Sequence, residues 1–281
     1  LVSDEISGLH FQGGYFYSGS GQNSTNQDGE LSTVYGETDF NNAEYAGFDY
    51  SFTDDLGIGL HAAKYSDVWN QYYADLYHTF SFSDDVSLSS SLNYYNTQDT
   101  GRSEAGSINN NTYSAAFALA VGAQTFTLAH QRVNGNTPFD YVNVDGADGN
   151  SIWLANSVQI SDFNAPGEKS YQARYDLDMS TFGVPGLSFM ARYITGSGVN
   201  GTNADVDGDY AGSYGRGGDE WERDLEVKYV IQEGAAKDLS FRVRQATWRA
   251  NNSPDSGFYG SNGANALDEV RIITEYPLDI L

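Results

Sequence analysis

Several basic residues stand at alternate positions in the last quarter of the sequence, where they could act on an anionic solute. Arg242 and Arg244 are two residues apart, so on a β-strand both side chains point to the same face. Lys228 and Arg271 fall in the segments before and after, which would be neighbouring strands of a meander. A guanidinium stays charged and binds a carboxylate through two parallel hydrogen bonds. These four residues predict a basic ladder along a wall, which would guide a carboxylate.

Two further arginines extend this candidate ladder. Arg174 and Arg192 point the same way on an earlier pair of expected strands. The alternative is that each arginine pairs with a neighbouring acid and only braces the wall. The acids available for such pairing include Glu226, Glu269 and Glu275. Spacing alone leaves both interpretations open.

The polar segment 135–167 is the second candidate for chemistry. It is too long for a plain connection, so we expect it to fold inward or over the mouth of a barrel. Acidic side chains that face a basic ladder would form a site for a zwitterion or a cationic amino acid. The alternative is an acidic surface loop. The polar residues concerned are Asp140, Tyr141, Asp145, Asp148 and Asp162.

Alternation of apolar and polar residues recurs along almost the whole chain and predicts an all-β fold. Soluble strands have about 5–6 residues, whereas a tilted strand that crosses a bilayer needs about 9–11. Most of the alternating segments are 10 to 14 residues long, which favours an antiparallel transmembrane β-barrel. The 12 expected strands cover residues 8–19, 44–53, 56–68, 70–82, 86–96, 111–121, 124–134, 168–181, 187–197, 220–232, 238–250 and 268–279.

The connections between these strands alternate in length. Short turns such as Thr53-Asp54-Asp55 and Gly122-Ala123 alternate with long polar loops. Short turns on one rim and long loops on the other are typical of an outer-membrane barrel. The long loops cover residues 20–43, 97–110, 135–167, 198–219 and 251–267.

The two faces of the expected strands differ in polarity. In segment 168–181, Tyr171 and Tyr175 share one face, while Arg174 and Asp176 share the other. A charged face opposite an apolar one, with aromatic residues near the strand ends, predicts a lipid-facing exterior and a wet lumen. A soluble antiparallel sandwich with one solvated face is the alternative, because period 2 alone does not exclude it. The aromatic residues near strand ends are Tyr15, Tyr17, Tyr72, Tyr94, Tyr193, Tyr229 and Tyr276.

The composition narrows the classes of function. With 38 acidic against 14 basic residues and a formal net charge of −24, the chain is not expected to bind nucleic acid. The absence of cysteine excludes disulfides and thiolate metal sites. The sequence shows no nucleophile-elbow motif and no metal-ligand spacing, so we predict no catalytic residue, no metal and no cofactor. The scattered histidines are His10, His61, His78 and His130.

Several long motifs resemble the OprD (Occ) family of outer-membrane substrate-specific porins. They are FGVPGLSFMARY at 182–193, YVIQEGAAKDLSFRVRQA at 229–246 and EVRIITEYPLDIL at 269–281. TPFDY at 137–141 and LANSVQISDFNAPGE at 154–168 add to the likeness. The motifs follow one another in the family's order, and the resemblance covers essentially all 281 residues.

The resemblance implies a fold larger than this sequence. The family builds an 18-stranded monomeric barrel, so residues 1–281 look like its C-terminal two-thirds, a single porin domain whose N-terminal strands are absent. The resemblance also implies Lys228, Arg242, Arg244 and Arg271 as ladder positions. It places Tyr141 and Asp162 at the constriction of the pore.

The function implied is passive uptake through the outer membrane of a Gram-negative bacterium. The solutes would be small and carboxylate-bearing, with basic amino acids such as arginine the best guess, and small antibiotics of similar charge sharing the path. The partners would be these solutes, the lipid bilayer and lipopolysaccharide. Two alternatives come from other classes: a barrel hydrolase with a Ser–His pair on the outer wall at His130, or a structural or adhesin barrel with a closed lumen.

Overall fold

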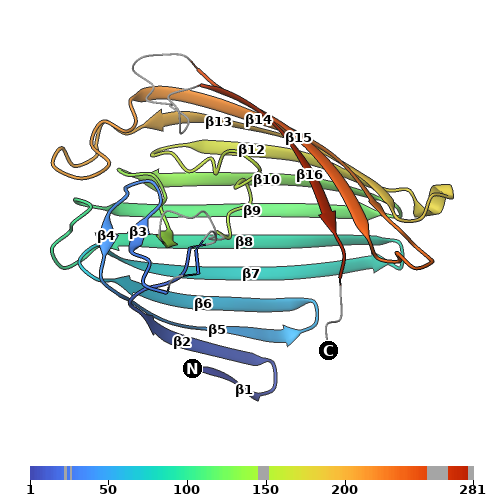
Figure 1. Cartoon of the computed structure of the whole chain (residues 1–281), viewed down its shortest axis with the longest axis horizontal. Coiled ribbons are helices and arrows are strands. Elements are labelled where there is room, and N and C mark those ends of the chain that lie inside the picture. Colours follow the sequence, from blue (N-terminus) through green and yellow to red (C-terminus); the bar gives the residue numbers. More distant parts are fainter. Residues whose placement is uncertain (22–23, 26, 145–151, 252–264, 278–281) are drawn as a thin grey trace.

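A large antiparallel sheet forms the wall of the molecule in this computed structural model, which describes residues 1–21, 24–25, 27–144, 152–251 and 265–277 (Figure 1). Each strand of the sheet is hydrogen-bonded to the next one along the chain. The 13 strands are β1 (Val2–Ile6), β2 (Leu9–Phe16), β5 (Ala43–Thr53), β6 (Leu56–Tyr65), β7 (Trp69–Ser83), β8 (Val86–Asp99), β9 (Asn109–Val121), β10 (Gln124–Gly135), β12 (Lys169–Asp178), β13 (Leu187–Asn200), β14 (Arg216–Val230), β15 (Ser240–Ala250) and β16 (Ala266–Glu275).

The all-β prediction is confirmed, and the sheet has the form of a section of barrel wall. It curves so that β14, β15 and β16 come forward of the middle strands (Figure 1). Within the described residues its edges are β1 and β16, which are not hydrogen-bonded to each other. A single turn of 3₁₀ helix, η1 (Ser180–Phe182), follows β12. No helix in these ranges is long and apolar enough to cross a membrane.

The expected count of 12 strands is corrected by the structure. All 12 are present with shifted ends, and the main sheet has a thirteenth, β1. The sequence VSDEI of β1 has only five residues and polar residues at three adjacent positions, so it shows no alternation. The expected strand 268–279 ends at Glu275, and its last two positions lie outside the described residues.

A second, small sheet joins two of the long loops. It consists of β11 (Val142–Val144), β3 (Leu31–Thr33) and β4 (Asp39–Phe40), in that order. Segments of two or three residues are too short for periodicity to reveal them. The main hydrophobic cluster lies around this sheet and under the loops. Its buried members are Leu31, Phe40, Ala43, Val68, Trp69, Ala105, Ile108 and Tyr210.

The main sheet has an apolar outer face and a polar inner face. On the outer face of β16, Val270 and Ile272 are 64% and 78% exposed. Leaving such a side chain in water costs about 1.5–3 kcal/mol relative to burial, so the surface suits lipid. On the inner face of β14, Glu222 and Asp224 are fully buried under loop and neighbouring side chains. The seven tyrosines expected near strand ends are all exposed, as the girdle prediction requires.

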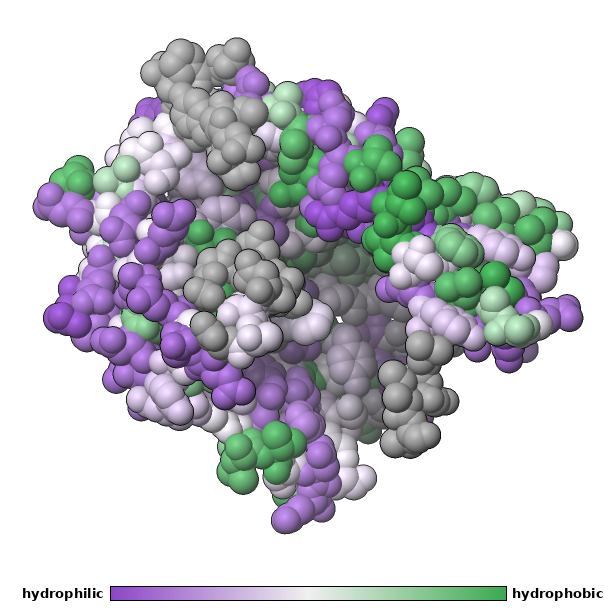
Figure 2. Space-filling view, in the orientation of Figure 1, coloured by the Kyte–Doolittle hydropathy of each residue, from purple (hydrophilic) through white to green (hydrophobic). Residues whose placement is uncertain are grey.

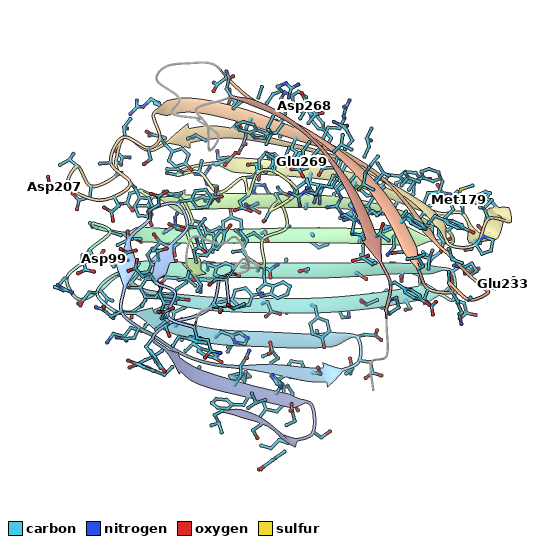
Figure 3. All side chains as sticks on the ribbon, viewed as in Figure 1. Asp99, Met179, Asp207, Glu233, Asp268 and Glu269 are labelled. Carbon is cyan, nitrogen blue, oxygen red and sulfur yellow. The ribbon has the colours of Figure 1, made fainter. Side chains whose placement is uncertain are left out.

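The two rims differ as the sequence predicts. Asp99 and Asp207 lie at the end with the long loops, whereas Met179 and Glu233 lie at the end with the short turns (Figure 3). Hydrophilic residues gather over the long-loop end on the left of Figure 2, and hydrophobic residues gather toward the opposite end. The inner wall and the folded long loops therefore position the candidate site.

Candidate functional site

The register of the last three strands brings the four ladder residues together on the inner face. Lys228 lies directly opposite Arg242, and Arg244 lies directly opposite Arg271. We call these four residues the basic block. Like charges that face each other across a sheet repel, so the basic block needs acidic side chains between its members. The nearest acid is Glu226, which lies opposite Arg244.

Acidic side chains occupy these gaps. The Glu226 carboxylate lies 2.6 Å from Arg244 Nη2 and 3.7 Å from Arg242 Nε, so one carboxylate serves two guanidinium groups. Arg242 also lies 3.4 Å from Glu275. Arg271 pairs with Glu269. These are the contacts that the bracing alternative expects.

The acids do not balance the basic residues of this block. The Lys228 side chain makes no ion pair or hydrogen bond with another described residue, and it is half-buried on the inner face. Four basic residues against three acids leave one surplus positive charge. Of the ion pairs in this block, that of Arg271 with Glu269 is open to solvent, and such a pair contributes only about 0–1 kcal/mol, so a solute carboxylate can exchange with it at low cost.

Arg174 and Arg192 lie opposite each other on β12 and β13, on the same face as the block. Each is held by an acid. Arg174 donates two hydrogen bonds of 2.7 Å to Asp176. Arg192 Nε lies 2.5 Å from Asp224, whose side chain is completely buried. These contacts fit the bracing interpretation, and a ladder role for Arg174 and Arg192 stays a prediction.

The predicted constriction residues Tyr141 and Asp162 are in direct contact. The hydroxyl groups of Tyr141 and Tyr35 donate to Asp162 Oδ2 over 2.9 and 2.7 Å, and Ser157 donates to Oδ1. Burial raises the pKa of Tyr35, and the negative charge of Asp162 raises it further, so the phenol keeps its proton. The result is one carboxylate oriented by three hydroxyl groups.

A second aspartate fastens the loop that carries this group. The Asp140 carboxylate accepts hydrogen bonds from the N–H groups of residues 34–36 over 2.9 to 3.1 Å. It also accepts from the N–H group of Tyr141 over 2.7 Å and from the Tyr210 hydroxyl over 2.8 Å. Asp140 therefore ties loops 20–43, 135–167 and 198–219 together. Asp145 and Asp148, also expected to matter, lie outside the described residues.

Gln159 connects the loop to the ladder. Its side-chain oxygen accepts a hydrogen bond of 2.6 Å from Arg244 Nη1, and its amide group donates to Glu269 over 3.0 Å. The loop 135–167 therefore folds inward against the wall. This is the first of the two arrangements expected from its length, the other being a fold over the mouth of the barrel. Nothing in the sequence distinguishes this glutamine from the others in the chain.

Two buried acids of β14 hold the same stretch of loop. Glu222 accepts hydrogen bonds from the backbone N–H groups of Ile160 and Ser161 over 2.9 and 2.8 Å. Glu220 accepts from the Ser161 hydroxyl over 3.0 Å and from the indole N–H of Trp248. Sequence reasoning could have found Glu220 and Glu222, because residues at alternate positions of a strand lie on one face, which here is the face of Lys228.

His130 has no hydrogen bond to a serine hydroxyl in the described part of the chain, whereas the hydrolase alternative expects a Ser–His pair. It lies on the outer face, where its ring stacks on Tyr171. Its Nδ1 lies 2.9 Å from the backbone oxygen of Ser170, which is an acceptor. Because a carbonyl oxygen can only accept, the Nδ1–H group donates to the backbone.

Comparisons with known proteins agree with this architecture. The family model described as outer membrane porin, OprD family, matches residues 1–280. Porin D of Pseudomonas aeruginosa is 45% identical over 287 residues, covering all of this chain and 63% of Porin D. The porin-like protein GalP of Pseudomonas putida is 33% identical, covering all of the chain and 62% of GalP. The chain thus spans just under two thirds of the length of these relatives.

Solved structures show the same fold. The structure of OprD from Pseudomonas aeruginosa superposes with a TM-score of 0.87 at 44% identity, covering 100% of this chain and 69% of that one. OccD3 from the same organism superposes with a TM-score of 0.86 at 34% identity, covering 100% and 67%. The described sheet corresponds to part of a larger barrel in these proteins.

Proposed function

Because the chain belongs to the OprD family of outer membrane porins, we propose that it forms part of a monomeric channel for passive uptake of small carboxylate-bearing solutes. Members of this family are porins of the Gram-negative outer membrane, and porins are not enzymes. The channel would select solutes through charged side chains along the pore, because a passing solute exchanges part of its hydration shell for contacts with the wall.

The solutes we propose are zwitterions and basic amino acids, with arginine as the best guess, and small antibiotics of similar charge. This choice of solutes rests on one observation: Gln159 lies between a positive charge, Arg244, and a negative charge, Asp162. On one side Gln159 contacts Arg244 of the basic block. Asp162 stands three residues further along the loop, so at most about 11 Å separates its Cα atom from that of Gln159. A solute carboxylate would meet the arginines while its ammonium or guanidinium group meets Asp162.

The experiment is liposome swelling with the full-length protein and three solutes: arginine, a neutral sugar of similar size and an organic dicarboxylate. We expect arginine to enter faster than the sugar. Entry of all three at rates set only by size would mean a general pore and would refute the proposed selectivity. Absence of entry would refute an open channel and favour a structural or adhesin barrel.

The variant R242Q/R244Q tests the basic block. If each contact contributes about 0.2–1 kcal/mol, the loss of two slows carboxylate entry roughly two- to thirtyfold relative to the sugar. The matched control is R223Q, because Arg223 alternates with the inner-face residues and its guanidinium group hydrogen-bonds to Gln245 and Thr247. Equal rates in R242Q/R244Q and R223Q would contradict the ladder and support the bracing alternative.

A further inference from the structure

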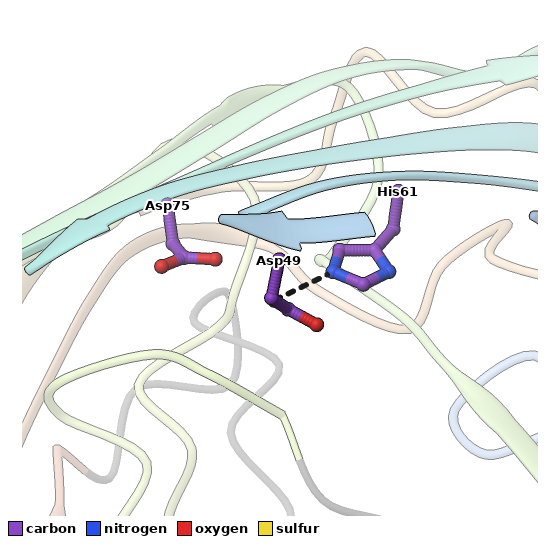
Figure 4. A group of neighbouring side chains, drawn as sticks. All are labelled: Asp49, His61 and Asp75. Atoms are coloured by element: carbon purple, nitrogen blue, oxygen red, sulfur yellow. Dashed lines mark hydrogen bonds and ion pairs between the residues drawn. The ribbon is translucent and has the colours of Figure 1, made fainter. Parts of the chain in front are cut away.

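Three potential metal ligands converge on the inner wall, away from the basic block. They are Asp49 on β5, His61 on β6 and Asp75 on β7, and one donor atom of each lies within 4.8 Å of the others (Figure 4). His61 Nε2 lies 3.2 Å from Asp49 Oδ1. We propose that these residues bind a divalent transition-metal ion on the wall of the pore.

Gly59 and Gly47 leave space on the inner face, and the side chains of the three potential ligands occupy it. Gly59 lies between Asp49 and Asp75 in the sheet register. A Cβ atom on Gly59 would stand 2.1 Å from Asp75 Oδ1 and 2.8 Å from Asp49 Oδ1. A Cβ atom on Gly47 would stand 2.1 Å from His61 Nδ1. The floor of the cluster is therefore open only because both positions lack a side chain.

The charge of the cluster favours a cation. Asp49 and Asp75 are both half-buried, and no Lys or Arg in the described part of the chain lies within ion-pair distance of either. The His61 imidazole and the Tyr73 phenol lie beside them, and the Tyr73 hydroxyl donates to Asn93 Oδ1 over 2.7 Å. Two carboxylates this close repel each other, and a divalent ion between them would remove the repulsion.

The donor set indicates the class of ion. One imidazole nitrogen with two carboxylate oxygens suits Zn²⁺ and neighbouring divalent metals, whereas soft Cu(I) prefers the thiolates that this chain lacks. Zn²⁺ binds such ligands at about 2.0–2.2 Å, so the donors must draw together. Asp49, whose side chain is 50% exposed, has the freedom to rotate.

The site would be reached from the path of the solute. His61 borders a cavity of about 640 Å³ whose wall also includes Tyr45, Gln71, Tyr73 and Tyr95. Three protein ligands leave a fourth position of a tetrahedral ion open to water or to an incoming carboxylate. Occupancy would also cancel two negative charges on the side of the pore away from the basic block.

Isothermal titration calorimetry with ZnCl₂ on the purified full-length protein tests the proposal. We expect one site in the wild type, and binding weakened by more than about tenfold in H61A and in D49N/D75N, since even indirect partners of a metal change affinity by that factor. The variant G59A should also weaken binding, because it fills the floor and leaves all three ligands in place. H130A is the matched control, because His130 lies on the outer face.

Three results would overturn the site. The first is the absence of Zn²⁺ binding to the wild type, and the second is equal affinity in H61A and H130A. The third is loss of binding in H10A but not in H61A, because His10 lies opposite Asp49 and contacts Asp4 at 2.6 Å, which offers a competing pair. Far-UV circular dichroism of each variant would show that the sheet has formed. The binding measurement does not depend on transport, so its outcome is independent of the channel proposal.

Discussion

The contact of Glu222 with the inward loop allows a quantitative prediction. The variant E222A removes the acceptor of the Ile160 and Ser161 N–H groups, which lie 2.9 and 2.8 Å from the carboxylate oxygens. A buried N–H group left without a partner costs about 1–3 kcal/mol, so two cost about 2–6 kcal/mol. Ile160 and Ser161 are only half-buried, and water can reach them. The lower end of that range, about 2 kcal/mol, therefore applies. It corresponds to a roughly thirtyfold rise in the equilibrium constant for local opening of the loop.

Amide hydrogen exchange of the peptide that contains Ile160 and Ser161 measures this opening. We expect exchange in E222A to accelerate by that factor, while peptides of β8 and β9 stay unchanged. Single-channel conductance should rise at the same time, because the loop would withdraw from the wall. The control is E233A, which removes an exposed acid at the short-turn rim. Unchanged exchange in E222A would show that the loop is held elsewhere and would refute this reasoning.

Three further variants probe the same region. D162N should slow arginine entry in liposome swelling roughly two- to fivefold without slowing the dicarboxylate, since only the cation loses its partner; equal slowing of both would contradict this. D140N should expose loop 135–144 to proteolysis while the sheet persists, because its hydrogen bonds to charged oxygen contribute about 1.5–3 kcal/mol each; unchanged cleavage would count against it. R192Q should lower the free energy of unfolding by about 3–5 kcal/mol, because it leaves Asp224 buried and unpaired; a denaturation midpoint equal to wild type would refute the bracing role.

Much of the wall could be predicted from the sequence, because strand alternation is a local signal. Period 2 fixes which side of a strand each residue occupies, so the shared face of Arg242 and Arg244 followed from their spacing. The small sheet of β11, β3 and β4 was missed, because β11 pairs with β3 across more than a hundred residues and all three strands are too short to alternate.

The candidate site was predictable in part. Tyr141 and Asp162 came from the likeness to a family; the structure brings them into contact at 2.9 Å, and their place at the constriction stays a prediction. Tyr35 and Gln159 could not be found, because each is one polar residue in a polar loop and only the folded chain shows what it contacts. The cluster of Asp49, His61 and Asp75 was hidden for another reason. Its members are 12 and 14 residues apart, and hairpin register, which is invisible to a motif search, brings them together.

The hydrophobic cluster under the loops has a consequence for the order of assembly. Neighbouring strands of the wall follow one another along the chain and are joined by a short turn or by one long loop, whereas the bond between Thr38 and Asp209 closes a span of 171 residues and that between Tyr210 and Asp140 one of 70. Long spans carry a larger entropic cost and form slowly. The strands of the wall should therefore pair first, and the loops tied by Asp140 should pack against one another last. Loss of the Asp140 carboxylate would then delay the folding of the pore mouth after the strands have inserted.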